Sequence, residues 1–105
     1  MSRDLVNPIV DLLDAAIRHR NVRLDCPQCR RVVILNGAAA WWLFERKRWA
    51  MKLSAVAIRF HCSACLRRRG ERFRPRVCLV EQEADLDTLP LPDGREWKRA
   101  LNGRR

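Results

Sequence analysis

Two pairs of cysteines, each with two residues between its members, constrain this chain more than any other feature. Cys26 and Cys29 lie in the segment LDCPQCRR, and Cys62 and Cys65 lie in RFHCSACLRRR, with 32 residues between the two pairs. A C-x2-C turn lets two sulfurs approach one metal ion, and structural zinc sites take four ligands in a tetrahedron. We therefore predict that the four cysteines together hold one structural Zn²⁺ ion, which is the cofactor that we expect.

Disulfide and redox pairing are the alternatives to a metal site. The sequence has no run of about 20 apolar residues and no secretory signal at its start, so we expect no membrane association and a cytoplasmic location, where disulfides are rare. A thioredoxin-like dithiol needs a C-x2-C at the start of a helix within a βαβ pattern, and we expect neither pair in that context. The sequence favours the metal and leaves the other two pairings open.

The segments that flank both cysteine pairs have the alternation of apolar and polar residues that half-buried strands show. Residues 21–26 and 57–62 alternate before each pair, and residues 30–35 and 76–82 are rich in valine, isoleucine and leucine after it. We expect each C-x2-C turn to join two strands into a β-hairpin.

Helical patterns fill much of the rest of the chain. Residues 7–20 carry one apolar stripe, with Asn7 as N-cap and Pro8 at the first helical position. Residues 38–49 contain strong helix formers, and we expect Ala40, Leu43, Phe44 and one tryptophan to be buried there. Residues 51–57 fit either a short helical turn or a loop.

These elements predict an α+β fold, a zinc-ribbon-like pair of β-hairpins with an inserted helix and an N-terminal helix. We expect residues 1–20 to form the N-terminal helix packed on the core and residues 21–82 to form the zinc-ribbon-like domain. Residues 83–105 begin with an acidic, proline-containing linker or ordered wrap. They end in a short helix or tail, in which Asp93 and Glu96 have capping-box spacing.

The chain has a formal net charge of +10, and the charge is concentrated in one part of the sequence. Sixteen lysines and arginines stand against three acidic residues between Arg18 and Arg76. A basic surface attracts polyanions such as nucleic acids. The predicted nucleic-acid-binding residues are Arg30, Arg31, Arg46, Lys47, Arg48, Arg67, Arg68, Arg69, Arg72 and Arg74. A solvated charged face without a partner, or the arginine bias of a GC-rich genome, also accounts for this composition.

Several single residues have a structural and a functional interpretation. The four tryptophans are Trp41, Trp42, Trp49 and Trp97. They can stack on bases if they are exposed, but we expect at least two of them to be buried. We expect His61 to lie on the surface rather than to bind the metal. His19 is expected at a helix end, and Cys78 as a small buried residue of the last strand.

The motifs C-P-x-C at Cys26, L-F-x-R at Leu43 and R-F-x-C-S-x-C at Arg59, followed by an apolar strand, resemble small bacterial zinc-ribbon-like proteins of uncharacterised function. The resemblance covers roughly Val22 to Val80. It implies that the four cysteines correspond to the zinc-binding positions of that family. Leu66 stands where such turns often have glycine after the last cysteine.

The functional hypothesis is a small, basic, zinc-stabilised, non-enzymatic nucleic-acid-binding protein, with DNA and RNA both open as ligands. The alternative is an adaptor that docks on a larger protein through arginine and tryptophan. Four cysteines fill the zinc shell and leave no position for a catalytic water. The sequence also has no serine-histidine-aspartate set and no phosphate-binding glycine loop. We therefore expect no enzymatic activity and no small-molecule substrate.

Overall fold

A three-stranded antiparallel sheet with its first strand in the centre organises the fold. The computed structural model describes residues 9, 11–85 and 89–103. Strand β1 (Asn21–Asp25) pairs with β2 (Val32–Leu35) on one side and with β3 (Arg76–Val80) on the other. The predicted α+β class and the first hairpin are therefore confirmed.

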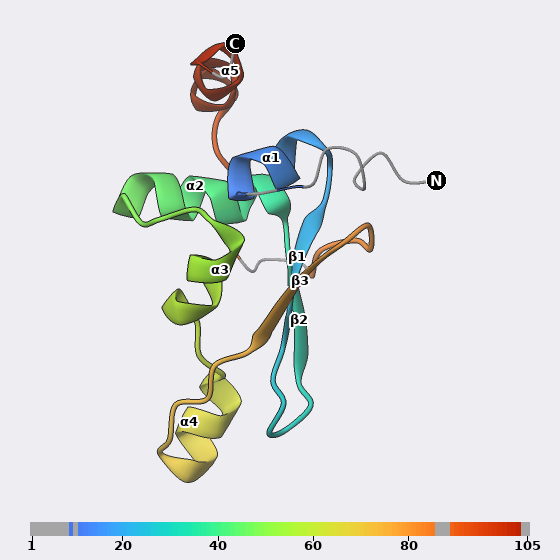
Figure 1. The fold of residues 1–105 in the computed structure, drawn as a ribbon, viewed down its shortest axis with the longest axis vertical. Coiled ribbons are helices and arrows are strands. Elements are labelled where there is room, and N and C mark those ends of the chain that lie inside the picture. The colour runs from blue at the N-terminus through green and yellow to red at the C-terminus, as the bar shows by residue number, and fades with distance from the viewer. Residues whose placement is uncertain (1–8, 10, 86–88, 104–105) are drawn as a thin grey trace.

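Five α-helices and one 3-10 helix accompany the sheet within the described residues. Their bounds are α1 Leu12–Ile17, α2 Gly37–Lys47, α3 Leu53–Val56, the 3-10 helix η2 Ala57–Arg59, α4 Ser63–Arg69 and α5 Gly94–Gly103. Helices α1, α2 and α3 lie against the upper part of the sheet, whereas α4 lies at the lower end beside the β1–β2 turn (Figure 1). None of these helices is long and apolar enough to cross a bilayer.

The prediction of a second hairpin is wrong. Residues 57–59 form η2 in continuation of α3, and the second cysteine pair lies at the start of α4 rather than in a strand turn. Strand β3 instead pairs with the free edge of β1, opposite β2. The run Leu66–Arg69 consists of good helix formers, and Gly70 ends the helix in the left-handed conformation at φ 71°. The chain therefore continues as a helix after Cys65 and does not turn back there as the second arm of a hairpin.

The first helix is shorter than the sequence pattern predicts. Asp11, not Asn7, is its N-cap, and the Asp11 carboxylate accepts a hydrogen bond from the Asp14 backbone N–H at 2.8 Å. Asn7 and Pro8 lie outside the described residues, while Ile9 is described and is not helical. His19 follows the helix in a left-handed conformation at φ 60° and is exposed.

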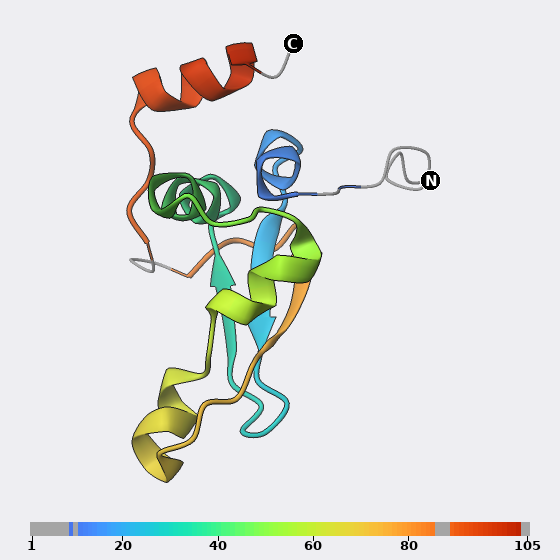
Figure 2. The same ribbon diagram turned by 60° about the vertical axis from the view of Figure 1, so that its left-hand side comes forward.

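The main core lies between α1, α2, α3 and one face of the sheet (Figure 2). Phe44 and Leu12 are fully buried in it, and Trp41 is 3% exposed. The other three tryptophans are partly buried around this core, so one tryptophan rather than two is buried. Leu43 is also only partly buried, while Ala40 is buried as predicted.

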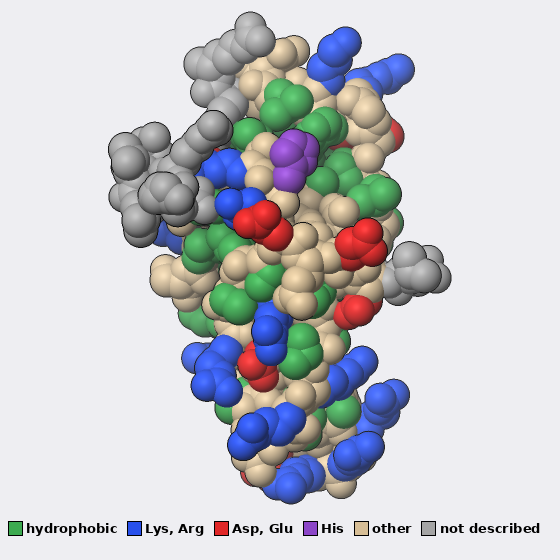
Figure 3. Space-filling view, turned by 90° about the vertical axis from the view of Figure 1, so that its right-hand side faces the viewer, with side chains coloured by type: hydrophobic (Ala, Val, Ile, Leu, Met, Phe, Trp, Pro, Cys, Tyr) green, Lys and Arg blue, Asp and Glu red, His purple; other side chains and the backbone are tan. Residues whose placement is uncertain are grey.

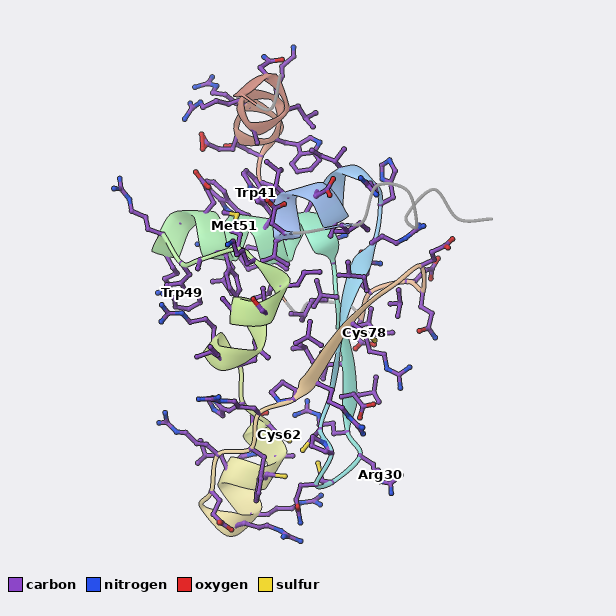
Figure 4. All side chains as sticks on the ribbon, in the orientation of Figure 1. Arg30, Trp41, Trp49, Met51, Cys62 and Cys78 are labelled. Atoms are coloured by element: carbon purple, nitrogen blue, oxygen red, sulfur yellow. The ribbon has the colours of Figure 1, made fainter. Side chains whose placement is uncertain are left out.

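The prediction for Cys78 is wrong, because β3 is an edge strand and this residue faces outward. Val22 and Leu24 of β1 pair with Leu79 and Val77 of β3 and pack toward the core. Cys78 pairs with Arg23 and is exposed, and Figure 4 shows it on the side of the sheet away from the helices.

The acidic segment is an ordered wrap where the structure describes it. The Asp85 backbone N–H donates to the Ile34 carbonyl, and the Asp85 carboxylate accepts from the Ile34 N–H, both at 2.8 Å. This segment therefore follows the outer edge of β2. The final helix α5 begins as predicted, because the Asp93 carboxylate accepts from the Glu96 N–H at 2.8 Å. Trp97 then contacts Trp41 edge to face, with ring centroids 5.6 Å apart.

Candidate metal centre

The structure brings the four predicted cysteines into one cluster at the lower end of the molecule. The sulfurs of Cys26 and Cys65 are 3.7 Å apart, those of Cys29 and Cys62 are 3.6 Å apart, and all four lie within 4.8 Å of one another. Metal–sulfur bonds of about 2.3 Å in a tetrahedron place the sulfurs about 3.8 Å apart. The four side chains can therefore hold one metal ion.

The first pair is positioned by the tight turn between β1 and β2. The Cys26 N–H donates to the Arg31 carbonyl, and the Arg30 N–H donates to the Cys26 carbonyl, both at 2.9 Å. Arg30 takes a left-handed conformation at φ 68°, which reverses the chain directly after Cys29. The turn thereby presents both sulfurs on one side.

The second pair is positioned by the start of α4. Cys62 is the N-cap of this helix, its N–H donates to the Phe73 carbonyl at 3.0 Å, and Cys65 lies in the first turn. The expectation that neither pair lies at a helix start is therefore wrong for this pair. The antiparallel sheet, however, provides no βαβ unit. Leu66 is helical, so the glycine expected in a turn after the last cysteine is not needed.

The two thiols of the second pair have opposite pKa shifts. A hydrogen bond from the Cys65 backbone N–H lowers the pKa of Cys62 to about 7, which favours its thiolate. Burial raises the pKa of Cys65 to about 12. A metal ion replaces the proton on such a buried thiol, so metal binding and proton release are linked.

The cluster is the centre of a second small core. Cys26, Cys62 and Cys65 are 2%, 7% and 2% exposed, and Ala64 and Phe73 pack against them. We call the turn 26–31 and the segment 62–75 the metal end. Phe73 was not predicted from the sequence, although it is the one aromatic residue among the arginines of that segment.

A direct hydrogen bond also joins the two halves of the metal end. The Arg31 guanidinium donates to the Ser63 hydroxyl at 2.8 Å. Ser63 was not singled out from the sequence, and its position directly after Cys62 is the signal that points to it. His61 is exposed, and it is not a member of the metal-binding group found among the described residues.

Seven of the ten predicted nucleic-acid-binding residues lie on the metal end and are exposed. We call them the arginine cluster: Arg30, Arg31, Arg67, Arg68, Arg69, Arg72 and Arg74. Figure 3 shows Lys and Arg side chains gathered at this end of the face it displays. Within the described part of the chain, none of the seven forms an ion pair with a carboxylate. Their charge is therefore available to a ligand.

The other three predicted residues lie elsewhere, around the carboxyl-terminal end of α2. Arg46 stacks over Trp42 at 5.3 Å from the ring centroid, and Lys47 lies 5.9 Å from the Trp49 ring. Arg48 is the C-cap of α2. These residues are exposed, but the structure does not place them in the arginine cluster.

A cavity of about 290 Å³ adjoins the cysteines. Its apolar wall includes Leu24, Val33, Leu35 and Phe60, and Cys26 and Cys62 also line it. Pro75 and Leu89 add to the apolar part, and the polar part of the lining consists of three exposed residues, namely Arg31, His61 and Ser63. This cavity could not be predicted from the sequence, because its walls come from segments that only the fold brings together.

Comparison with protein-family models, with curated proteins and with solved structures finds no match for this chain. The resemblance to zinc-ribbon-like proteins therefore stays a prediction. The fold and the site define a small α+β protein with a cluster of four cysteines that can hold a metal ion.

Proposed function

We propose that this protein is a zinc-stabilised module that binds nucleic acid through the arginine cluster, without enzymatic activity. The observation that carries the proposal is the position of seven exposed arginines around one four-cysteine site. They come from both halves of the metal end, residues 30–31 and 67–74. A metal that fixes the two halves also fixes the spacing of their positive charges.

Zinc is the metal that fits the cluster best. Four sulfur ligands in a tetrahedral arrangement are typical of zinc or of iron–sulfur sites. A site closed by four cysteines contributes folding energy and leaves no open coordination position for a reacting water. The Zn²⁺ ion would be held by Cys26, Cys29, Cys62 and Cys65, and its role would be structural.

The arginines supply affinity by displacing counterions from phosphates. The segments 26–31 and 62–75 contain the seven cluster arginines and one acidic residue, Glu71. The charge of −2 on a zinc ion with four thiolates reduces this excess but leaves it positive. Such contacts fix the position of a nucleic acid and carry no information about its sequence. The proposed binding is therefore strongly dependent on salt and weakly dependent on sequence.

The acidic segment does not cover the arginine cluster where the structure describes it. Glu81 lies 3.6 Å from Arg20, far along the sheet from the metal end, and Asp85 is bound to the edge of β2. This arrangement supports an intermolecular anion as the ligand rather than an internal one.

A salt titration of nucleic-acid binding tests the proposal. The variant Arg67→Gln/Arg68→Gln removes two charges from the last turn of α4, and Arg95→Gln/Lys98→Gln removes two exposed charges from α5 as the matched control. We expect the first variant to lower the slope of log K against log salt by about 1.4 on single strands. The control should leave the slope unchanged. Absence of binding to any DNA or RNA at low salt would refute the proposal.

The adaptor remains the second candidate, and the surface around Trp49 is the observation that favours it. Trp49 is half-buried, packs edge to face on Phe44, and has the Arg59 guanidinium 4.7 Å from its ring centroid. Arginine and tryptophan are frequent anchors of protein interfaces. Partners retained from a nuclease-treated lysate, and lost in Trp49→Ala, would support the adaptor.

A further inference from the structure

We infer that the cavity beside the cysteines receives one unpaired base, so that the protein selects single-stranded over duplex nucleic acid. This inference rests on the proposed function and goes beyond it, because the arginine cluster alone would bind both forms. The cavity and the arginine cluster share Arg31, which lines the cavity and belongs to the cluster. A strand whose phosphates contact the cluster therefore has a base within reach of the cavity.

The size and lining of the cavity fit one flat apolar group. Its volume of about 290 Å³ is at the lower limit of the range for sites that bind drug-sized molecules. A single base is smaller than such molecules and fits this volume. Leu24, Val33 and Leu35 form aliphatic walls, and Phe60 contributes an aromatic ring. That ring contacts the buried ring of Phe44, at a centroid distance of 5.8 Å. An aromatic ring held in this way is the platform on which single-strand binders stack a base.

The polar part of the lining matches the edge of a base and its backbone. Arg31, His61 and Ser63 are exposed, so they lie where the cavity meets solvent. The hydrogen bond from Arg31 to Ser63 uses one of the five guanidinium donors and leaves the others for a phosphate or a base edge. A duplex keeps its bases stacked and paired, and must open before one can enter.

An acidic peptide with one apolar side chain is the competing ligand for the same cavity. Seven exposed arginines without described ion-pair partners favour a chain with a regular row of negative charges over a peptide with one or two carboxylates. The observations therefore favour nucleic acid, and the experiment separates the two.

The test compares four probes of the metal-loaded full chain by fluorescence anisotropy at one salt concentration. They are a single-stranded oligodeoxythymidine, an abasic strand of the same length, a duplex of the same length, and an acidic peptide that contains one leucine. We expect the oligodeoxythymidine to bind on the order of 10-fold tighter than the abasic strand, which has the same phosphates and no base. The duplex should bind no better than the abasic strand.

Two variants test whether the cavity causes the preference for the base-bearing strand. Val33→Phe fills it without changing the charge, and Phe60→Leu removes the stacking ring; intact metal content and circular dichroism identify folded variants. In at least one folded variant the preference for the base-bearing strand should disappear while the salt slope stays unchanged.

The failures of the two proposals are distinguishable. Absence of binding to all three nucleic acids overturns the proposed function. Equal binding of the oligodeoxythymidine, the abasic strand and the duplex leaves the proposed function standing and overturns the base-binding cavity. Tighter binding of the peptide than of the abasic strand, lost in Val33→Phe, also overturns it and assigns the cavity to a protein partner.

Discussion

Removal of the metal should open the metal end and leave the main core folded. The two clusters of buried residues are separate: the main core contains Leu12, Val22 and Phe44, and the small core contains the cysteines with Ala64 and Phe73. The burial of three cysteines and the partial burial of two neighbours contribute about 5 kcal/mol to the free energy of folding. A structural zinc ion contributes about 10–16 kcal/mol. A bound zinc ion would therefore supply most of the stability of this end.

Hydrogen exchange, followed by mass spectrometry before and after chelation, measures this effect residue by residue. Besides the hydrogen bonds within α4, five backbone hydrogen bonds hold the metal end: Cys26 N–H to Arg31, Arg30 N–H to Cys26, Cys62 N–H to Phe73, Leu66 N–H to Cys62 and Gly70 N–H to Leu66. Their amides should lose nearly all protection on chelation. The amides that join β1 to β3 should stay protected, because these strands pack on the main core.

Cysteine variants give the matched control for this prediction. Cys65→Ser removes a buried ligand and should reproduce the effect of chelation, whereas Cys78→Ser changes an exposed thiol outside the cluster and should not. Two results would refute the reasoning. Unchanged protection of residues 62–75 would show that the metal is not needed there, and simultaneous loss of the β1–β3 amides would show that the two cores unfold as one.

Three further perturbations test other features of the structure. Gly37→Ala should lower the free energy of unfolding by about 1–3 kcal/mol in a urea titration, because its Cβ would collide with the Arg20 carbonyl oxygen; Gly94→Ala, which meets open space, is the control. Arg30→Gly should raise the stability of the metal-loaded protein by up to about 1 kcal/mol, since the residue adopts φ 68°; a decrease would contradict this. Metal affinity should fall about tenfold or more for each unit of pH lowered from 8 to 6. The thiol of Cys65, with its pKa raised to about 12, holds a proton that must leave on binding; pH-independent affinity in a competition titration would exclude this linkage.

The sequence was informative wherever the signal was local. Asp93 had capping-box spacing with Glu96, and in the structure its carboxylate accepts a hydrogen bond from the Glu96 N–H. Spacing alone identified the four cysteines, because two sulfurs two residues apart can meet at one ion whether the turn is a hairpin or a helix start. This tolerance explains why the predicted cluster survives although one of its two supporting elements was predicted wrongly.

The prediction of a second hairpin failed because the pairing of a strand depends on neighbouring strands that cannot be identified from its own sequence. Residues 57–62 alternate as a strand does, but their predicted partner, residues 76–82, contains β3, which pairs with the free edge of β1 instead. The prediction that Cys78 is buried failed for the same reason. Which side chains of β3 face the core depends on its register with β1, and in this register Cys78 pairs with Arg23 and faces outward. An alternating pattern indicates that a segment can form a strand, but it does not indicate which strand that segment pairs with.

The helical start of the second pair connects the fold with the proposed function. Because Cys62 and Cys65 begin α4, Arg67, Arg68 and Arg69 follow within one turn of the last ligand and are held by the same helix. The helix carries them at the metal end, where Arg31 also lies because its guanidinium donates to Ser63 at the start of the same helix. A bound metal ion would thus fix the arginine cluster and the part of the cavity lining that belongs to the metal end, whereas the walls from Leu24, Val33 and Phe60 belong to the main core. The opening of the metal end on chelation should therefore lower the affinity that the arginine cluster provides and weaken strand selectivity.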